Sequence, residues 1–276
     1  MSHDLRHRTN MVHREAEDWR PPLFDPPTTP RARLVAALRQ FFDLQAGSVW
    51  RDVAAVLPSV RGAMVDVGCG AQPYRPLVHP GVRYRGIDTD AARAHFGYEI
   101  PDTEYFAGDV WPLADASVNF VLATETLEHV FDTGRFVGEA ARCLEPGGTL
   151  MMTVPFAARW HFIPHDFWRF TPSSLERILA AHGFVEVRVY ARGNALTVAC
   201  YKAMALVLRL LMPQGAGTVA GALLRALGLA LVPAFVGLAV IANLSLRGRG
   251  GDDCLGYTVL ASRATATAAR TGTRSP

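Results

Sequence analysis

A short apolar stretch that ends in two closely spaced glycines constrains this chain more than any other feature. Residues 63–67 read as a buried strand, and Gly68 and Gly70 follow it at once. Glycine is needed where the backbone turns tightly against a ligand, because a Cβ atom would collide there. Asp88 ends a second apolar run about 20 residues later, where a carboxylate can accept hydrogen bonds from ribose hydroxyls. The pattern predicts a site for an adenosine-type cofactor.

The glycine spacing also discriminates between cofactors. A dinucleotide-binding turn would carry a further glycine three positions after Gly70, where helix and strand pack closely, but Pro73 stands there. This substitution favours a cofactor with a single nucleoside over NAD or FAD. A nicotinamide-dependent reductase on a related sheet is the alternative, although the chain has no Tyr-x-x-x-Lys pair.

Strand-like and helix-like segments alternate along most of the chain. The strand candidates are short apolar runs without strict polar–apolar alternation, as expected for parallel strands covered on both faces. They lie at residues 63–67, 84–87, 105–107, 118–124, 149–154, 185–190 and 256–262. Helical spacing of apolar residues predicts helices over 31–44, 49–57, 133–143 and 173–182. These alternating units predict a doubly wound α/β sheet.

The composition changes after residue 194. Residues 195–246 consist mainly of Ala, Leu, Val and Gly, and their only charged side chains are Lys202, Arg209 and Arg225. The uncharged run 226–246 is long enough to cross a bilayer, but a full span conflicts with the return of the last strand to the sheet. We therefore expect an apolar helical insertion that is a membrane-associating hairpin, a lid over the acceptor pocket or a dimer interface.

The two ends of the chain differ from its body. The first residues are rich in charge and proline, and Trp19, Leu23 and Phe24 could dock them onto the body. The last residues are rich in Ala, Thr and Arg. The predicted organisation is a flexible arm (1–30), a folded domain (31–194 and 255–263), the apolar insertion (195–250) and a disordered tail (264–276).

Composition excludes several classes of function. The 276 residues include 28 basic and 25 acidic side chains, and this net charge of +3 is too small for a dedicated nucleic-acid binder. The 4 cysteines are far apart and form no CxxC pair, so neither a zinc knuckle nor a disulfide framework is expected. The N-terminal residues lack the apolar core of a secretory signal, and the protein is expected in the cytoplasm.

Five motifs, in this order, resemble those of the class I S-adenosylmethionine-dependent methyltransferases, and in particular their type 11-like domain. They are DVGCG at 66–70, GID at 86–88, GDV at 108–110, LEHV at 127–130 and LEPGGTL at 144–150. The resemblance covers residues 61–190 and the last strand. It implies a Rossmann-like seven-stranded sheet, mostly parallel with the last strand antiparallel, and S-adenosyl-L-methionine as the cofactor.

At the methionine end of the cofactor, the resemblance assigns four residues. Gly68 and Gly70 would let the backbone approach the methionine part, and Asp66 would orient the turn or bind the amino group. Thr124 would line the wall near the sulfonium. The family often has a further glycine where this chain has Gln72, which could reshape this end of the site.

At the nucleoside end, the resemblance implies that Asp88 binds the ribose hydroxyls. Asp109 would accept a hydrogen bond from the adenine amino group, with the backbone of Val110 beside it. By itself Asp109 could instead be a loop acid that caps a helix, but its spacing from Asp88 favours the adenine role.

Histidines provide the candidates for acceptor chemistry. A sulfonium carries an activated methyl group, so the protein chiefly aligns the acceptor and excludes water. A hydroxyl acceptor also benefits from a base, and imidazole suits this role. His165 is the preferred base and His129, directly after the fourth strand, is the second candidate.

The run 160–172 resembles an HDYWRFT element of methyltransferases in sugar, polysaccharide and secondary-metabolite pathways. Its alternative interpretation is structural: Trp168 and Phe170 in the core, Asp166 paired with Arg169, and a helix start at 171–172. A metal ion held by His161, His165 and Asp166 was the remaining option. No matching ligand set appears elsewhere, so no metal is expected.

The sequence thus predicts an S-adenosylmethionine-dependent methyltransferase that O-methylates a small-molecule, sugar or lipid-linked acceptor. The insertion would give it peripheral contact with the inner face of the membrane, and a homodimer is a further option. The non-catalytic alternative is a membrane-associated module that binds the nucleoside cofactor without turnover.

Overall fold

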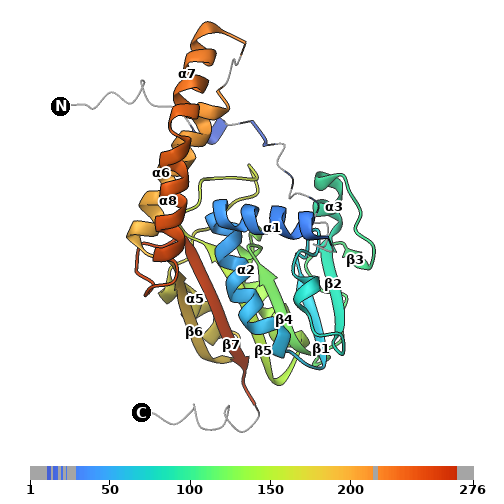
Figure 1. The fold of residues 1–276 in the computed structure, drawn as a ribbon. Helices are drawn as coiled ribbons and strands as arrows, with labels where there is room; N and C mark the ends of the chain where they lie inside the picture. Colours follow the sequence, from blue (N-terminus) through green and yellow to red (C-terminus); the bar gives the residue numbers. More distant parts are fainter. Residues whose placement is uncertain are drawn as a thin grey trace, which may run out of the picture.

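A sheet of seven strands, in the order β3-β2-β1-β4-β5-β7-β6, forms the centre of the computed structural model, which describes residues 11–13, 15–17, 20, 23, 29–213 and 217–265 (Figure 1). The strands are β1 (Ala63–Val67), β2 (Arg83–Thr89), β3 (Thr103–Phe106), β4 (Val118–Thr124), β5 (Leu144–Pro155), β6 (Phe184–Arg192) and β7 (Gly256–Arg263). β1 to β5 pair in parallel, whereas β7 is antiparallel to both β5 and β6. The predicted mixed sheet with an antiparallel last strand is confirmed.

Helices cover both faces of this sheet, which explains why its central strands are apolar throughout. On one face, Val49 and Val53 of α2 pack with Met64 and other strand residues. On the opposite face, α4 and α5 pack on Val65, Val121 and Leu150. The helices of the domain are α1 (Pro30–Phe42), α2 (Leu44–Val56), α3 (Asp90–Phe96), α4 (Thr133–Cys143) and α5 (Pro172–Ala181). Short 3₁₀ segments are η1 (Met11–His13), η2 (Leu57–Ser59), η3 (Arg75–Leu77) and η4 (Leu127–His129).

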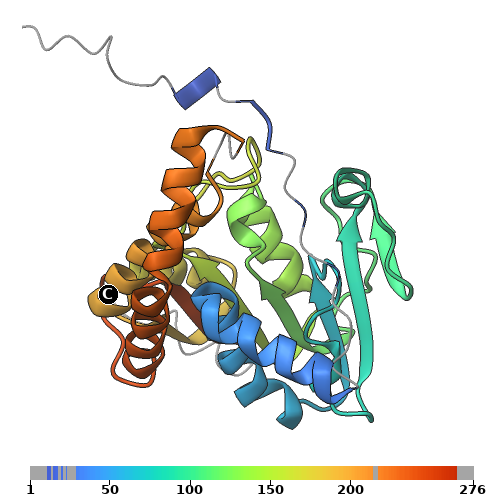
Figure 2. The ribbon, with the colours of Figure 1, turned by 45° about the horizontal axis from the view of Figure 1, so that its top comes forward.

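The corner between α1 and α2 differs from the prediction. α2 begins at Leu44, five residues before the predicted start, because the Asp43 side chain caps it by accepting from Ala46 N at 3.1 Å. A Cβ atom on Gly47 would lie 2.0 Å from the Gln40 carbonyl oxygen. Glycine therefore lets the two helices meet closely, and α1 lies over the end of the sheet (Figure 2).

The apolar insertion folds as three helices, α6 (Ala195–Leu211), α7 (Val219–Ala230) and α8 (Val232–Ser245). Cys200 and Met204 of α6 pack against Ala239 and Ala242 of α8, and Leu44 of α2 joins this cluster. The unit extends beyond the end of the sheet at which α1 lies (Figure 1). Many of its apolar side chains are exposed: Leu206, Met212, Val219, Leu223, Leu227, Leu229, Val236, Val240, Ile241 and Leu244.

The uncharged run 226–246 is divided between α7 and α8 at Leu231. None of the helices in the described ranges is by itself long and apolar enough to span a bilayer. α7 and α8 together satisfy the criteria of length and composition, but their axes are bent by 49°. A continuous span over 226–246 therefore does not match the observed helix boundaries.

The predicted arm and tail lie mostly outside the described residues, as do Trp19 and Phe24 of the predicted docking residues. Leu23 is described and is exposed. Glu17 provides the contact with the body: Glu17 N donates to Ile163 O at 3.0 Å, and its carboxylate accepts from Phe162 N at 2.8 Å. The same carboxylate pairs with Arg159 at 2.7 Å. A charged residue of the arm thus fastens the loop that follows β5.

Candidate active site

A cavity of about 750 Å³ opens where the carboxyl ends of β1, β2 and β4 meet. β1 is the strand at which the chain order reverses, and ligands of doubly wound sheets bind at such a switch point. α1 and α2 close one side with Gln40 and Trp50. Every described residue that lines the cavity lies between positions 36 and 165, so none comes from the apolar insertion. The lid alternative for that insertion has no support in these contacts.

The glycine turn after β1 lines this cavity, and its two glycines are needed for different reasons. Both have positive φ, +66° at Gly68 and +49° at Gly70. A Cβ atom on Gly68 would lie 2.5 Å from Thr126 Cγ2, whereas one on Gly70 would meet no atom within 4 Å. Gly68 is therefore required by packing against Thr126. Gly70 leaves space in the cavity that a Cβ atom would fill, and a bound ligand can use this space.

Asp66 lies behind this turn and is not among the residues that line the cavity. Its Oδ2 accepts from the Tyr84 hydroxyl at 2.9 Å, and its buried Oδ1 has no hydrogen-bond partner among the described residues. Burial raises the pKa of Asp66 to about 7, which the bond from Tyr84 opposes. A carboxylate behind the turn fits the first of the two predicted roles, orienting the turn, and the contact with the amino group stays a prediction.

Asp88 joins the end of β2 to the glycine turn. Its Oδ2 accepts from Gly70 N at 3.0 Å and its Oδ1 from Thr89 N at 2.8 Å. The side chain is nearly buried and lines the cavity. Burial raises the pKa of Asp88, and the two backbone bonds oppose this shift. Each carboxylate oxygen has further lone pairs, so the group can still accept from ribose hydroxyls.

Asp109 also lines the cavity and pairs with Arg135 of α4 at 3.2 Å. Val110 does not line the cavity, and its side chain is exposed. Trp111 takes a place in the wall instead, with its ring 5.1 Å from that of Phe136. Trp111, Arg135 and Trp50 also line the cavity and were not predicted from the sequence. Trp111 lies next to a predicted residue, but only the fold brings α2 and α4 to this cavity.

Thr124 and both candidate bases also line the cavity. His129 belongs to η4, and its Nδ1 lies 2.8 Å from the carbonyl oxygen of His165 in the loop after β5. Burial lowers the pKa of His129 to about 4. Phe162 lies between the two histidines, with its ring 5.2 Å from His129 and 5.3 Å from His165. The structure thus brings together the two histidines that the sequence proposed separately.

The loop over residues 156–171 is held by side-chain contacts of the kind that the structural interpretation of the run 160–172 predicts. Asp166 accepts from Arg169 at 2.6 and 2.8 Å and from His161 N at 3.1 Å. Phe170 is buried, but Trp168 is half-exposed and donates from Nε1 to Val130 O, so the core assignment is wrong for Trp168. Since Asp166 is occupied by Arg169 and His161, the metal set with His165 is not assembled.

Comparison with known proteins agrees with this geometry. The methyltransferase domain family matches residues 65–152, from β1 to β5. A ubiquinone biosynthesis O-methyltransferase of Azorhizobium caulinodans is 30% identical over 160 residues, which cover 48% of this chain and 62% of that protein. An uncharacterized methyltransferase of Mycobacteroides abscessus is 32% identical over 134 residues, or 43% of this chain and 51% of that protein.

Among solved structures, a methyltransferase of Thermotoga maritima that depends on S-adenosylmethionine has a TM-score of 0.50 at 16% identity. The likeness covers 84% of this chain and 97% of that one, and it concerns the fold. The chain covers 35% to 66% of the lengths of the curated relatives it matches. The glycine turn, Asp88 and the family match together confirm S-adenosylmethionine as the cofactor expected from the motifs. Residues 65–152 thus form a domain of the class I S-adenosylmethionine-dependent methyltransferase type.

Proposed function

We propose that the protein transfers a methyl group from S-adenosylmethionine to a hydroxyl oxygen of a small, apolar or lipid-linked acceptor. The observation that carries this proposal is the shared cavity, which is lined by the glycine turn, by Asp88 and by both His129 and His165. The name of the O-methyltransferase relative agrees with oxygen as the acceptor atom. An acceptor that is already a carboxylate or thiolate would need no histidine there.

The bound cofactor supplies an electrophilic methyl group. Asp88 and the glycine turn hold the nucleoside, and the aromatic side chains that line the cavity exclude water from the reacting atoms. The acceptor oxygen forms a bond to the methyl carbon while the carbon–sulfur bond breaks, which leaves a neutral thioether. The hydroxyl proton passes to the imidazole of His165, because burial lowers the pKa of His129 to about 4 and makes that imidazole a weak base.

The mouth of the cavity is apolar, which favours an apolar acceptor. Phe131 lines the cavity, is largely exposed, and packs edge-on against the half-exposed Phe167 at 5.6 Å. On α1, Leu34 and Leu38 are exposed but do not line the cavity, which this helix meets with Gln40. Exposed apolar side chains at a binding site mark a surface that an apolar molecule can cover.

The insertion supports a membrane-bound acceptor. Its helices, which carry exposed leucines and valines, extend beyond the end of the sheet at which α1 lies (Figure 1), and α1 also lines the cavity. Residues 195–251 contain five basic and no acidic side chains, a charge that suits an anionic bilayer. The proposed partner is therefore the surface of an anionic membrane, which α7 and α8 contact peripherally.

Two assays test these proposals. Labelled S-adenosylmethionine with lipid extracts should yield an O-methylated product, and His165→Ala should lower turnover while S-adenosylhomocysteine binds as before. Transfer only to nitrogen would refute the oxygen acceptor. For the surface, anionic vesicles should sediment the wild-type chain but not Leu223→Asp, with Val185→Asp on the exposed side of β6 as the control. Dimerisation through α7 without vesicle binding would refute the membrane contact.

A further inference from the structure

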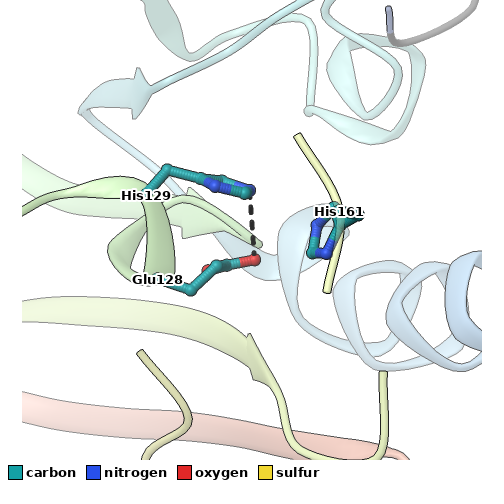
Figure 3. A group of neighbouring side chains, drawn as sticks. All are labelled: Glu128, His129 and His161. Atoms are coloured by element: carbon teal, nitrogen blue, oxygen red, sulfur yellow. Dashed lines mark ion pairs between the residues drawn. The ribbon is translucent and has the colours of Figure 1, made fainter. Parts of the chain in front are cut away.

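We infer that Glu128, His129 and His161 form a binding site for one divalent transition-metal ion of the zinc type, beside the cavity whose wall includes His129 (Figure 3). One ligand atom from each of the three side chains lies within 4.8 Å of the others. Two imidazoles and one carboxylate are a ligand set that binds zinc and related ions and leaves positions for an exogenous ligand.

The two histidines come from different segments and face the same carboxylate. His129 Nε2 lies 3.6 Å from Glu128 Oε1, and the rings of His129 and His161 are 5.0 Å apart at an angle of 81°. η4 supplies two of the three ligands, and the loop after β5 supplies the third. Figure 3 shows one carboxylate oxygen of Glu128 directed toward the ring of His129, with His161 beside it.

Hydrogen bonds on the far side of each ring select the tautomer that a metal requires. His129 Nδ1 lies 2.8 Å from the His165 carbonyl oxygen, which only accepts, so Nδ1 carries the hydrogen and Nε2 keeps its lone pair. His161 Nδ1 lies 3.0 Å from Asp166 Oδ2, and Asp166 is itself fixed by Arg169. Carbonyl and carboxylate partners of this kind orient histidine ligands in metal sites.

Glu128 provides an independent indication of a missing cation. Its side chain has an exposed fraction of 0%, and neither carboxylate oxygen has a hydrogen-bond partner among the described residues. Nearby cationic groups are engaged elsewhere, since Arg169 bonds to Asp166 and Arg192 bonds to Glu125 at 2.7 Å. A buried carboxylate without partners is costly, and a divalent ion would compensate both oxygens.

The position of the ion gives it a role in the proposed methyl transfer. The side chains of His129 and His161 are 17% and 19% exposed, so the histidine side of the site stays open while the glutamate side is closed. His129 also lines the cavity together with His165. This role rests on the proposed function: the open position would hold the acceptor oxygen and lower its pKa. Metal binding itself does not depend on it.

Titration of the chelator-treated full chain with Co²⁺ alone tests the site. We expect a visible ligand-field spectrum that saturates at one ion per chain and disappears when Zn²⁺ is added. Glu128→Gln and His161→Asn should each weaken Co²⁺ affinity by more than the 10- to 100-fold typical of losing an outer partner. Binding of S-adenosylhomocysteine shows that each variant is folded, and His161→Asn, at a partly exposed side chain, is the variant of choice should Glu128→Gln fail to fold.

His182→Asn is the matched control, because His182 Nδ1 also lies 2.8 Å from a backbone carbonyl oxygen, that of Ile178, but far from this group. It should bind Co²⁺ like the wild type. Absence of the spectrum in the wild type would overturn the site and leave Glu128 as a buried neutral acid. Equal Co²⁺ affinity in all three variants would also overturn it. Co²⁺ binding without any methyl transfer would uphold the site and count against the proposed function alone.

Discussion

The two glycines of the cofactor turn should respond differently to the same substitution. Both have positive φ, a conformation that costs an L-residue about 1–2 kcal/mol. Gly68→Ala also places a methyl group 2.5 Å from Thr126 Cγ2 and 2.7 Å from its Oγ1. Overpacking of this kind costs about 1–3 kcal/mol more. We therefore expect a loss of about 2–5 kcal/mol in the free energy of unfolding for Gly68→Ala, against about 1–2 kcal/mol for Gly70→Ala.

The order reverses for cofactor affinity. The added methyl at Gly70 enters open space in the cavity. Gly70→Ala should therefore weaken S-adenosylhomocysteine binding more than Gly68→Ala does, although it lowers the free energy of unfolding less. Urea unfolding gives the free energies, and calorimetry of the folded variants gives the affinities. Thr126→Ala should rescue part of the Gly68→Ala loss, because it removes both clashing atoms. Equal stability losses at the two glycines, or no rescue by Thr126→Ala, would refute the packing argument.

Two further predictions concern buried and bridging carboxylates. Asp66 binds more protons folded than unfolded between pH 3.8 and about 7, so its contribution lowers the free energy of unfolding as pH rises through that window. The hydrogen bond from Tyr84 opposes the rise in the pKa of Asp66, and the charge of Asp88 adds to it. Asp66→Asn should therefore reduce the dependence of the free energy of unfolding on pH, measured by urea unfolding at several pH values. An unchanged dependence would contradict this prediction. Glu17→Gln should weaken a charge-assisted bond to the loop after β5, worth about 1.5–3 kcal/mol, and speed hydrogen exchange at Phe162. Glu15→Gln is its exposed control, and equal exchange in both variants would count against the contact.

Local patterns made the strands and the cofactor turn predictable from sequence. β1 and β4 have the predicted boundaries, because a continuous apolar run bounded by turn residues specifies a strand buried on both faces. β5 begins at Leu144 rather than at 149. Its first residues, with Pro146 and Gly147, have the composition of a turn, and only pairing with Val118 extends the strand to them.

Contacts between distant segments could not be predicted in this way. The sequence suggested His161, His165 and Asp166 as neighbours because they are close along the chain. His161 and Asp166 do meet, at 3.0 Å, and the Asp166–Arg169 pair was also predicted, because both contacts are local. The contact of His161 with His129 of another element was not predicted. Which side chains meet at the end of a sheet depends on the path of each connecting loop, and local periodicity in the sequence does not predict that path. The docking of Glu17 on the loop after β5 is of the same kind.

Calorimetry of Asp88→Ala with S-adenosylhomocysteine tests the central claim most directly, because Asp88 joins the glycine turn to the proposed ribose site. Loss of hydrogen bonds to a charged acceptor, at about 1.5–3 kcal/mol each, predicts an affinity at least about 10-fold weaker than that of the wild type. Asp90→Ala is the matched control, since Asp90 pairs with Arg93 on α3 and does not line the cavity; it should bind like the wild type. An Asp88→Ala variant that is folded and binds as tightly as the wild type would contradict the account.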